Sequence, residues 1–459
     1  MHPTPRTTSF PFLLLALGIG LVPATGLPAQ GKQDAALKKE LRTKETAAKQ
    51  DPDKLCDVAA WAVEKGLAAD GKRLYEAVVK LSPDHARAHA ALGHVQVDGA
   101  WVPKAEAEAA QGKALAAAMQ AKGLVEVDGV WVKKEHVEDG KRGVFHHDGE
   151  RVHRDDYLQL QGGKVRHPAT GELIAAADLA QAKAGKFPLD SGQWGDEAAA
   201  DAFHAKGRPW VVRASFATVV SHLPLAKVRE LAAQIDSAWV RIAPLFGTTE
   251  PLPAHRPLVV VAASEAEYAQ LGQQAGDEAS STSAFLALPN ARLSLPGFAD
   301  VRPGICDGTG ALGVYSARHA AGLAIAHSIG RDLGLDLPPW LLHGVGSLTS
   351  RLHVPGDAGH YARQDLEAGG VTDPKAMCRS FSLAGAPAAR RHAQFQVGLM
   401  LDFALQGRDD AAKAATNAFA DACKHGDKAA AQKALAALEE ALAAAQAKLV
   451  AYQQELARN

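Results

Sequence analysis

The stretch AIAHSIGRDLGLDLPPWLLHGVGS, from Ala324 to Ser347, decides the architecture of the second half of the chain. Its first part continues a segment of high helical propensity, and Gly334 is a typical helix stop. His327 and Arg331 lie one helical turn apart and therefore share a face of that helix. The two prolines that follow are typical of a helix start. The stretch thus predicts two consecutive helices, with His343 in the first turn of the second.

This helix pair resembles the active-site helices of gluzincin-type metallopeptidases. That family carries H-E-x-x-H on the first helix and a ligand Glu on the second, within P-x-W-L-x-E-G-x-A, whereas this chain has HSIGR and PPWLLHGVGS. The chain from Trp210 onward also resembles peptidase-MA-like domains of exported bacterial proteins. The resemblance implies an α+β fold, in which a zincin-like C-terminal domain combines a small mixed sheet, active-site-type helices and a helical C-terminal lobe.

The residues at the family's functional positions have largely been replaced. His327 keeps the first zinc-ligand histidine, and His343 stands where the ligand glutamate is expected. Ser328 replaces the general base and Arg331 replaces the second histidine. A catalytic zinc needs about three protein ligands, and a serine cannot take a proton from zinc-bound water as the glutamate does. The resemblance therefore implies a degenerate site with no catalytic residue and no bound metal or cofactor, in which the two histidines are vestigial.

Arg331 carries a further expectation about this degenerate site. A guanidinium stays charged, so we expect Arg331 to occupy the vacated metal position and replace the cation. A metal-dependent hydrolase with zinc on a rebuilt histidine site remains an alternative, because histidines are locally dense. They are His319, His327, His343, His353 and His360. The first two lie about two helical turns apart, too far for one ion unless the helix bends. The chain has no G-x-S-x-G motif, which argues against serine catalysis.

The first 30 residues have the pattern of a secretory signal peptide. Arg6 precedes an apolar run from Phe10 to Val22, and small residues follow. The run is shorter than the roughly 20 residues needed to span a bilayer, and Pro23 ends it. We therefore expect export with cleavage and an extracytoplasmic location, periplasmic or secreted, with no membrane span in the mature chain.

The chain after this signal divides into segments of different composition. Helical spacing with Trp61, Leu74 and Tyr75 resembles one tetratricopeptide-like helical hairpin. A Gly-, Pro- and Asp-rich break precedes the mixed domain, in which a β-hairpin is expected across 285–295. The predicted boundaries are 1–30 for the signal peptide, 31–93 for the helical module, 94–183 for hairpin repeats with a helical spacer, 184–200 for a linker and 201–459 for the degenerate peptidase-like domain.

The repeats lie in the second of these segments. HVQVDGAWVPK at 94–104 recurs as LVEVDGVWVKK at 124–134, and a looser copy, GVFHHDGERVH, begins at Gly143. Valines alternate on either side of an Asp-Gly pair in the first two copies. Because Asp-Gly supplies the two positive φ angles of a type I′ turn, each copy predicts a short β-hairpin.

Charge and composition narrow the classes of partner. The 459 residues include 50 Lys and Arg against 51 Asp and Glu, so no net field attracts nucleic acid. We expect an exported, non-catalytic, metallopeptidase-like protein that acts as a binding or scaffolding module and holds a peptide or protein in its vestigial cleft. A structural protein of envelope assembly is the second alternative.

Overall fold

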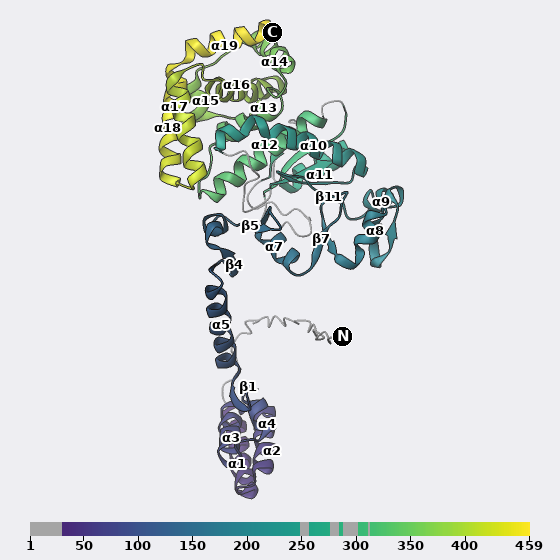
Figure 1. Ribbon diagram of the computed structural model, residues 1–459, viewed down its shortest axis with the longest axis vertical. Helices are drawn as coiled ribbons and strands as arrows, with labels where there is room; N and C mark the ends of the chain where they lie inside the picture. Colours follow the sequence, from purple (N-terminus) through teal and green to yellow (C-terminus); the bar gives the residue numbers. More distant parts are fainter. Residues whose placement is uncertain (1–29, 248–256, 276–283, 288–301, 311–312) are drawn as a thin grey trace. The chain divides into compact units, whose positions relative to one another are not determined.

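The computed structural model describes residues 30–247, 257–275, 284–287, 302–310 and 313–459 (Figure 1). The expected signal peptide thus lies outside the described residues except for its last position. The chain forms two compact units, a first that ends at Lys122 and a second from Gly123 to Asn459. Helices predominate and the strands form small sheets, which confirms the α+β class.

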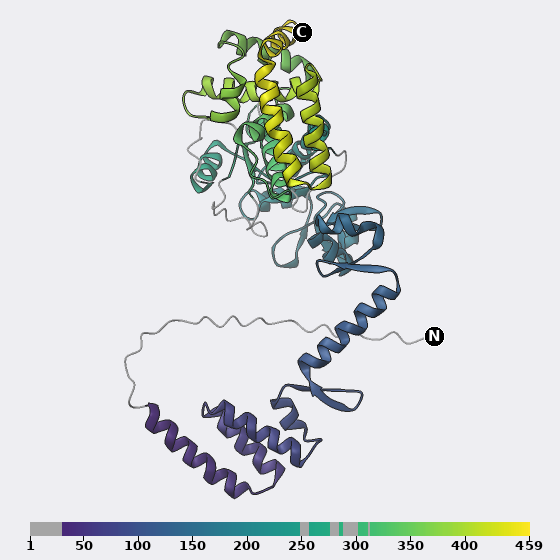
Figure 2. The same cartoon turned by 90° about the vertical axis from the view of Figure 1, so that its left-hand side faces the viewer.

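The first unit contains five helices and one hairpin, and its first and last helices are the longest (Figure 2). The expected helical hairpin is present as α2 and α3, where Asp51 caps the N-terminus of α2. Leu55, Leu74 and Val78 form part of its core. The elements are α1 (Gln30–Ala48), α2 (Pro52–Glu64), α3 (Ala68–Leu81), α4 (Ala86–Ala91), β1 (His94–Val97), β2 (Ala100–Pro103) and α5 (Lys104–Ala121).

The second unit begins with three more hairpins, each followed by a short helical segment. At the Asp-Gly pairs both residues have positive φ, as the type I′ turn requires, for example 48° at Asp148 and 83° at Gly149. A hairpin that the sequence did not reveal is β7–β8, which lacks Asp-Gly and turns at Gly171 instead. The elements are β3 (Leu124–Val127), β4 (Val130–Lys133), η1 (Lys134–His136), α6 (Val137–Lys141), β5 (Val144–His147), β6 (Glu150–His153), α7 (Arg154–Gln161), β7 (Lys164–Arg166), β8 (Leu173–Ala175), η2 (Ala176–Asp178) and α8 (Leu179–Lys183).

The segment 184–200 belongs to the folded domain, which corrects its prediction as a linker. Phe187 packs edge-on against Trp210 with ring centroids 5.3 Å apart, and Ala200 is fully buried in the same core. Asp190 and Gly192 form the turn between its two very short strands, and Asp196 caps the helix that follows. The elements are β9 (Phe187–Pro188), η3 (Asp190–Gly192), β10 (Trp194–Gly195) and α9 (Glu197–His204).

A five-stranded mixed sheet follows, in the order β11-β12-β13-β15-β14. The three central strands are parallel and both outer strands antiparallel. Val259 and Val261 face the core with α10 and α12, whereas Val260 faces Tyr268 of α11, so β13 is apolar on both faces. Only the first strand of the hairpin expected across 285–295 is described, and it pairs with β15. The elements are β11 (Trp210–Arg213), β12 (Thr218–Ser221), α10 (Leu225–Ile242), η4 (Ala243–Phe246), β13 (Leu258–Ala262), α11 (Glu265–Ala275), β14 (Ala284–Leu286) and β15 (Gly304–Asp307).

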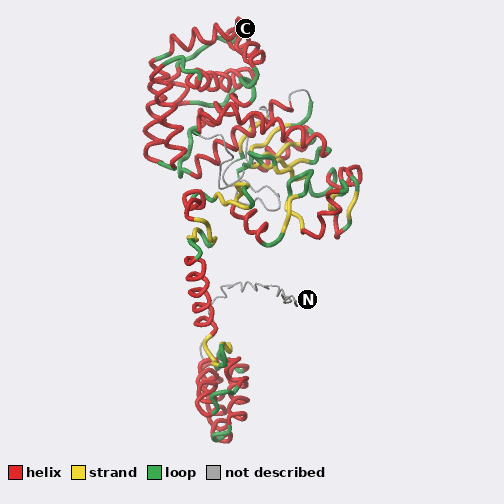
Figure 3. Tube along the Cα trace, in the orientation of Figure 1, coloured by secondary structure: helices red, strands yellow, loops and turns green. Residues whose placement is uncertain are grey.

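The rest of the unit is helical, as Figure 3 shows in red. Gly334 follows α12 with φ of 65°, and Pro338 is the N-cap of α13, so the predicted helix boundaries are confirmed. The elements are α12 (Gly313–Asp332), α13 (Pro339–Thr349), α14 (Pro355–Glu367), α15 (Pro374–Ser380), α16 (Pro387–Leu405), α17 (Asp410–His425), α18 (Lys428–Ala444) and α19 (Gln446–Arg458). Within the described part of the chain, no helix is both long and apolar enough to cross a bilayer.

Candidate functional site

Helices α12 and α13 cross at glycines, and this close approach builds the site. A Cβ atom on Gly322 would lie 2.6 Å from Thr349 Oγ1 and 2.8 Å from Gly346 Cα. Thr349 Oγ1 donates a hydrogen bond of 2.8 Å to the carbonyl of Arg318, which joins the two helices at the same level. Only glycine allows the backbones to come this near. The crossing therefore fixes which side chains of α12 meet those of α13.

The side chain of α12 that meets His343 is His319. His319 Nε2 lies 3.5 Å from His343 Nδ1, and the ring centroids are 5.7 Å apart. On its other side the His343 ring stacks on Phe381 at 5.2 Å. His327 lies two turns further along α12, roughly 12 Å away along the axis. The prediction placed His327 and His343 together as the two vestigial metal-ligand positions. This pairing is wrong, because the histidine of α12 that contacts His343 is His319, two turns before His327.

Arg331 lies with His327 at that distant end of α12. The charges around His327 are those of Arg302, Arg331 and Asp336, and burial together with the two arginines lowers the pKa of His327 to about 4. Ser328, next in the chain, is buried. Arg331 thus lies beside His327 and not beside His343, and its expected role as a replacement for the metal cation stays a prediction. The cation close to His343 is Arg351 instead.

A chain of hydrogen bonds runs through the histidine pair. Ser350 Oγ donates to the carbonyl of Gly346 at 2.7 Å, and it lies 3.3 Å from His319 Nδ1. We therefore assign the proton of His319 to Nδ1, which donates to Ser350 Oγ, and leave Nε2 to accept from His343 Nδ1. Both nitrogens of His319 and the hydroxyl hydrogen of Ser350 are then engaged. In this state neither residue is a free metal ligand or an activated nucleophile.

The histidine pair is uncharged at neutral pH. Burial lowers the pKa of His343 to about 4, and the nearby Arg351 guanidinium adds to the effect. Burial also lowers the pKa of His319 well below its usual range, again with a contribution from Arg351. The structure therefore holds two neutral imidazoles next to a cation.

These residues do not fit a catalytic zinc ion. Among the described residues, no third side chain of His, Cys, Asp or Glu lies close enough to His319 and His343 to share an ion with them. The set there lacks a third donor and a carboxylate base, and Arg351 would repel the ion. We derive no hydrolytic step for this site.

The described part of the chain does contain one three-residue group, in the hairpin segment. His136 stacks on His146 with ring centroids 3.7 Å apart, and His146 Nε2 lies 2.8 Å from Asp139 Oδ2. Two guanidinium groups also bind this carboxylate, Arg142 at 2.6 Å and Arg151 at 3.3 Å. Burial alone would raise the pKa of Asp139, but the hydrogen bond from His146 and the two arginines outweigh it and lower the pKa. The group is an ion-pair network rather than a metal site.

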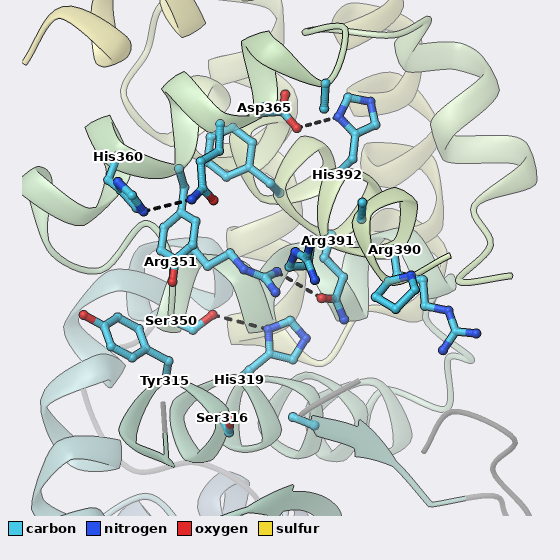
Figure 4. Close-up of a pocket in the computed structure, with 18 of the residues that line it drawn as sticks. Tyr315, Ser316, His319, Ser350, Arg351, His360, Asp365, Arg390, Arg391 and His392 are labelled. Carbon is cyan, nitrogen blue, oxygen red and sulfur yellow. Dashed lines mark hydrogen bonds and ion pairs between the residues drawn. The ribbon is translucent and has the colours of Figure 1, made fainter. Parts of the chain in front are cut away.

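His319 and Ser350 form part of the wall of a pocket of about 700 Å³ (Figure 4). The other lining residues come from the first strand residue of β14, the start of α12, the loop after α13, one face and the end of α14, and the first turns of α16. Arginines are prominent among them, and none was predicted as a site residue. They are Arg351, Arg390 and Arg391. The Arg390-Arg391-His392 run was visible in the sequence, but only the packing of α16 beside α14 turns it into a pocket wall.

A buried carboxylate fixes that wall. Asp365 of α14 is 4% exposed and accepts from His392 Nδ1 at 2.6 Å and from Gln453 Nε2 at 2.7 Å. Gln396 Nε2 donates to Oδ2, the oxygen that also accepts from Gln453, whereas His392 binds Oδ1. The three donors come from α16 and α19, so one carboxylate joins three helices. Because its oxygens are engaged, Asp365 contributes structure to the pocket rather than a free negative charge.

The remaining two histidines of the alternative metal site lie apart from the pair. His360 is exposed at the pocket rim and contacts Gln364 at 3.1 Å. His353 has Arg318, Arg241 and Asp357 as its charged neighbours. The five histidines therefore do not gather around one point. Comparison of the chain with protein-family models, curated proteins and solved structures found no match.

Proposed function

We propose that the chain is an exported binding protein whose second unit keeps the frame of a zinc metallopeptidase without its chemistry. The observation that carries the proposal is the hydrogen-bonded chain of His343, His319 and Ser350, of which His319 and Ser350 line the pocket. A peptidase needs zinc ligands and a base at this place. Here the side chains bind one another instead, beside a pocket large enough for a ligand.

The helix crossing suggests a second way to align the family phrase with α12, starting at His319 instead of His327, and this alignment also supports the proposal. If the H-E-x-x-H phrase is aligned on His319, which faces α13, the base position falls on Ala320 and the second ligand position on Leu323. Both residues are fully buried and apolar. The original alignment on His327 puts serine and arginine at these positions. A general base and a second ligand are therefore lacking in both registers.

The five-stranded mixed sheet and the helix pair beside it are the elements that the resemblance implies. In this proposal the occupant of the pocket is an extended peptide or a segment of a partner protein, because the pocket combines aromatic side chains with hydrogen-bonding groups. Catalysis is not part of the function.

The zinc content of the purified full chain, measured by inductively coupled plasma mass spectrometry after dialysis against 1 µM zinc, tests the proposal. We expect well under one zinc per chain, because two neutral imidazoles beside a guanidinium hold the ion weakly. A variant with Ala320→Glu, Leu323→His and His343→Glu is expected to take up about one zinc, since it adds two ligands to His319, at positions 323 and 343, and a base at position 320.

The matched control is the variant Ser328→Glu, Arg331→His and His343→Glu, which restores the phrase in the other register and should gain no zinc. Stoichiometric zinc in the natural chain, or cleavage of an unstructured protein such as casein by it, would contradict the proposal. That result does not depend on whether the substituted variants fold.

A further inference from the structure

Among the described residues, Arg351 is a cation without an anionic partner. Its Nη1 donates to Gln394 Oε1 at 3.0 Å, and the guanidinium lies 5.8 Å from the ring centroid of Tyr361. Burial lowers its pKa to about 10, and the charged neighbour recorded beside it is another arginine, Arg391. Arginines removed from water are normally paired with carboxylates. No such pair is present for Arg351 in the described part of the chain.

The other arginines strengthen this positive region. Figure 4 shows Arg391 next to Arg351 in the pocket wall. Arg390, at the edge of the pocket, donates from Nε to the carbonyl of Gly385 at 2.9 Å, while its buried Nη1 has no hydrogen-bond partner. Two adjacent guanidinium groups repel each other, so their proximity costs free energy in the empty pocket. A bound anion would remove that cost.

The acidic residues of the pocket do not neutralise these arginines. Asp365 is engaged by His392, Gln396 and Gln453. Glu367 is exposed at the rim. The pocket interior beside Arg351 is therefore short of negative charge, and the missing charge is one that a ligand would supply.

The other residues that line the pocket indicate which groups such a ligand has besides its negative charge. Tyr315, Tyr361 and Phe395 present aromatic surface to the pocket. A volume of about 700 Å³ is within the range of sites that enclose a small molecule or a few residues of a peptide. The pocket thus suits an anionic group attached to a partly apolar body.

We infer that the pocket binds the C-terminal carboxylate of a peptide, with Arg351 as its principal partner and Arg391 as a second cation. A carboxylate is planar and matches the two parallel N–H groups of a guanidinium. The aromatic side chains then contact the last side chains of the peptide. This inference rests on the proposed binding function and names the class of ligand for the same pocket.

The test uses the immobilised full chain and two pooled hexapeptide libraries of the same random composition, one with free C-termini and one amidated. Retained peptides are quantified by mass spectrometry. We expect free-carboxylate peptides to be retained about 10- to 150-fold more than amidated ones, the range that a hydrogen bond to a charged group gives. The ratio should fall to about one in Arg351→Met, and it should be unchanged in Arg379→Met, whose side chain is exposed on α15.

Each other outcome has a defined meaning. Equal retention of free and amidated peptides overturns the carboxylate inference and leaves the binding function standing. Retention of no peptide by the folded chain overturns both, and calorimetry with inorganic phosphate then shows whether the arginines hold a free small anion instead. Cleavage of retained peptides overturns the non-catalytic function. A tenfold preference for free C-termini in the same experiment would still support the carboxylate site. Near-ultraviolet circular dichroism confirms that each variant is folded.

Discussion

His343 shows how a single side chain can be placed correctly on a helix and still be assigned the wrong partner. Its position in the first turns of α13 follows from the prolines before it. Its neighbour depends on where two helices cross, which local pattern does not determine. The glycines of α13 were the available signal, because small residues on one helix face indicate a close approach. With that signal His319, two turns before His327, becomes the expected partner.

The pH dependence of stability follows from the pKa of His343. The pKa is about 4 in the folded chain and about 6.5 in an unfolded one. Between these pH values the unfolded chain binds more protons than the folded chain. The contribution of the uncharged His343 to the free energy of unfolding is therefore complete above pH 6.5 and is lost as the pH falls towards 4. The parent chain should lose free energy of unfolding between pH 7 and pH 4.5. In His343→Gln, which has no imidazole to protonate at this position, we expect this loss to be smaller by about 2 kcal/mol, at 1.4 kcal/mol per pKa unit.

Urea unfolding of the parent and the variant at the two pH values measures this difference. His425→Gln is the control, because this histidine is exposed at the end of α17 and does not belong to the pair. An equal loss of stability in the parent and in His343→Gln would show that His343 is not held uncharged by its surroundings.

At the scale of elements, the sequence was informative wherever a local signal sets the structure. The Asp-Gly turns and the helix start at Pro339 both follow from short patterns. The hairpin β7–β8 was missed because its wider loop uses Gly171 without an Asp-Gly pair. The segment 184–200 was misassigned because turn residues are equally common in linkers and in tightly folded connections. What distinguishes the two is tertiary contact, here of Phe187 with Trp210.

The crossing of α12 and α13 predicts a large effect for a small substitution. A Cβ atom on Gly346 would lie 2.8 Å from the His319 ring, which is itself buried. We expect Gly346→Ala to lower the free energy of unfolding by about 1–3 kcal/mol, because the helices must separate to accept the methyl group. In Gly356→Ala, where nothing lies within 4 Å of the new atom, the free energy should stay the same or rise by up to about 1 kcal/mol. Urea denaturation of both variants compares them, and equal effects would contradict the close crossing.

At the scale of the whole molecule, the chain consists of two units with separate cores. Leu55, Leu74 and Val78 belong to a core within the first unit, and the main core lies entirely in the second. We expect fragments 30–122 and 123–459 to fold independently, with melting temperatures within a few degrees of two transitions seen in the full chain. Differential scanning calorimetry of the three proteins measures this. A fragment 30–122 without a cooperative transition would show that the first unit depends on the second.

The evenly spaced glycines before the hairpins have a consequence for how this protein can change in length. Gly123, Gly143 and Gly163 each have positive φ and each lead into a β-strand, at intervals of 20 residues. Removal of 144–163 would join Gly143 to Lys164 and so restore the same glycine-to-strand junction. Insertion of a whole unit would do likewise. Recombination between such copies would change the length of the hairpin segment in steps of 20 residues and would leave the sequence that forms the pocket unchanged.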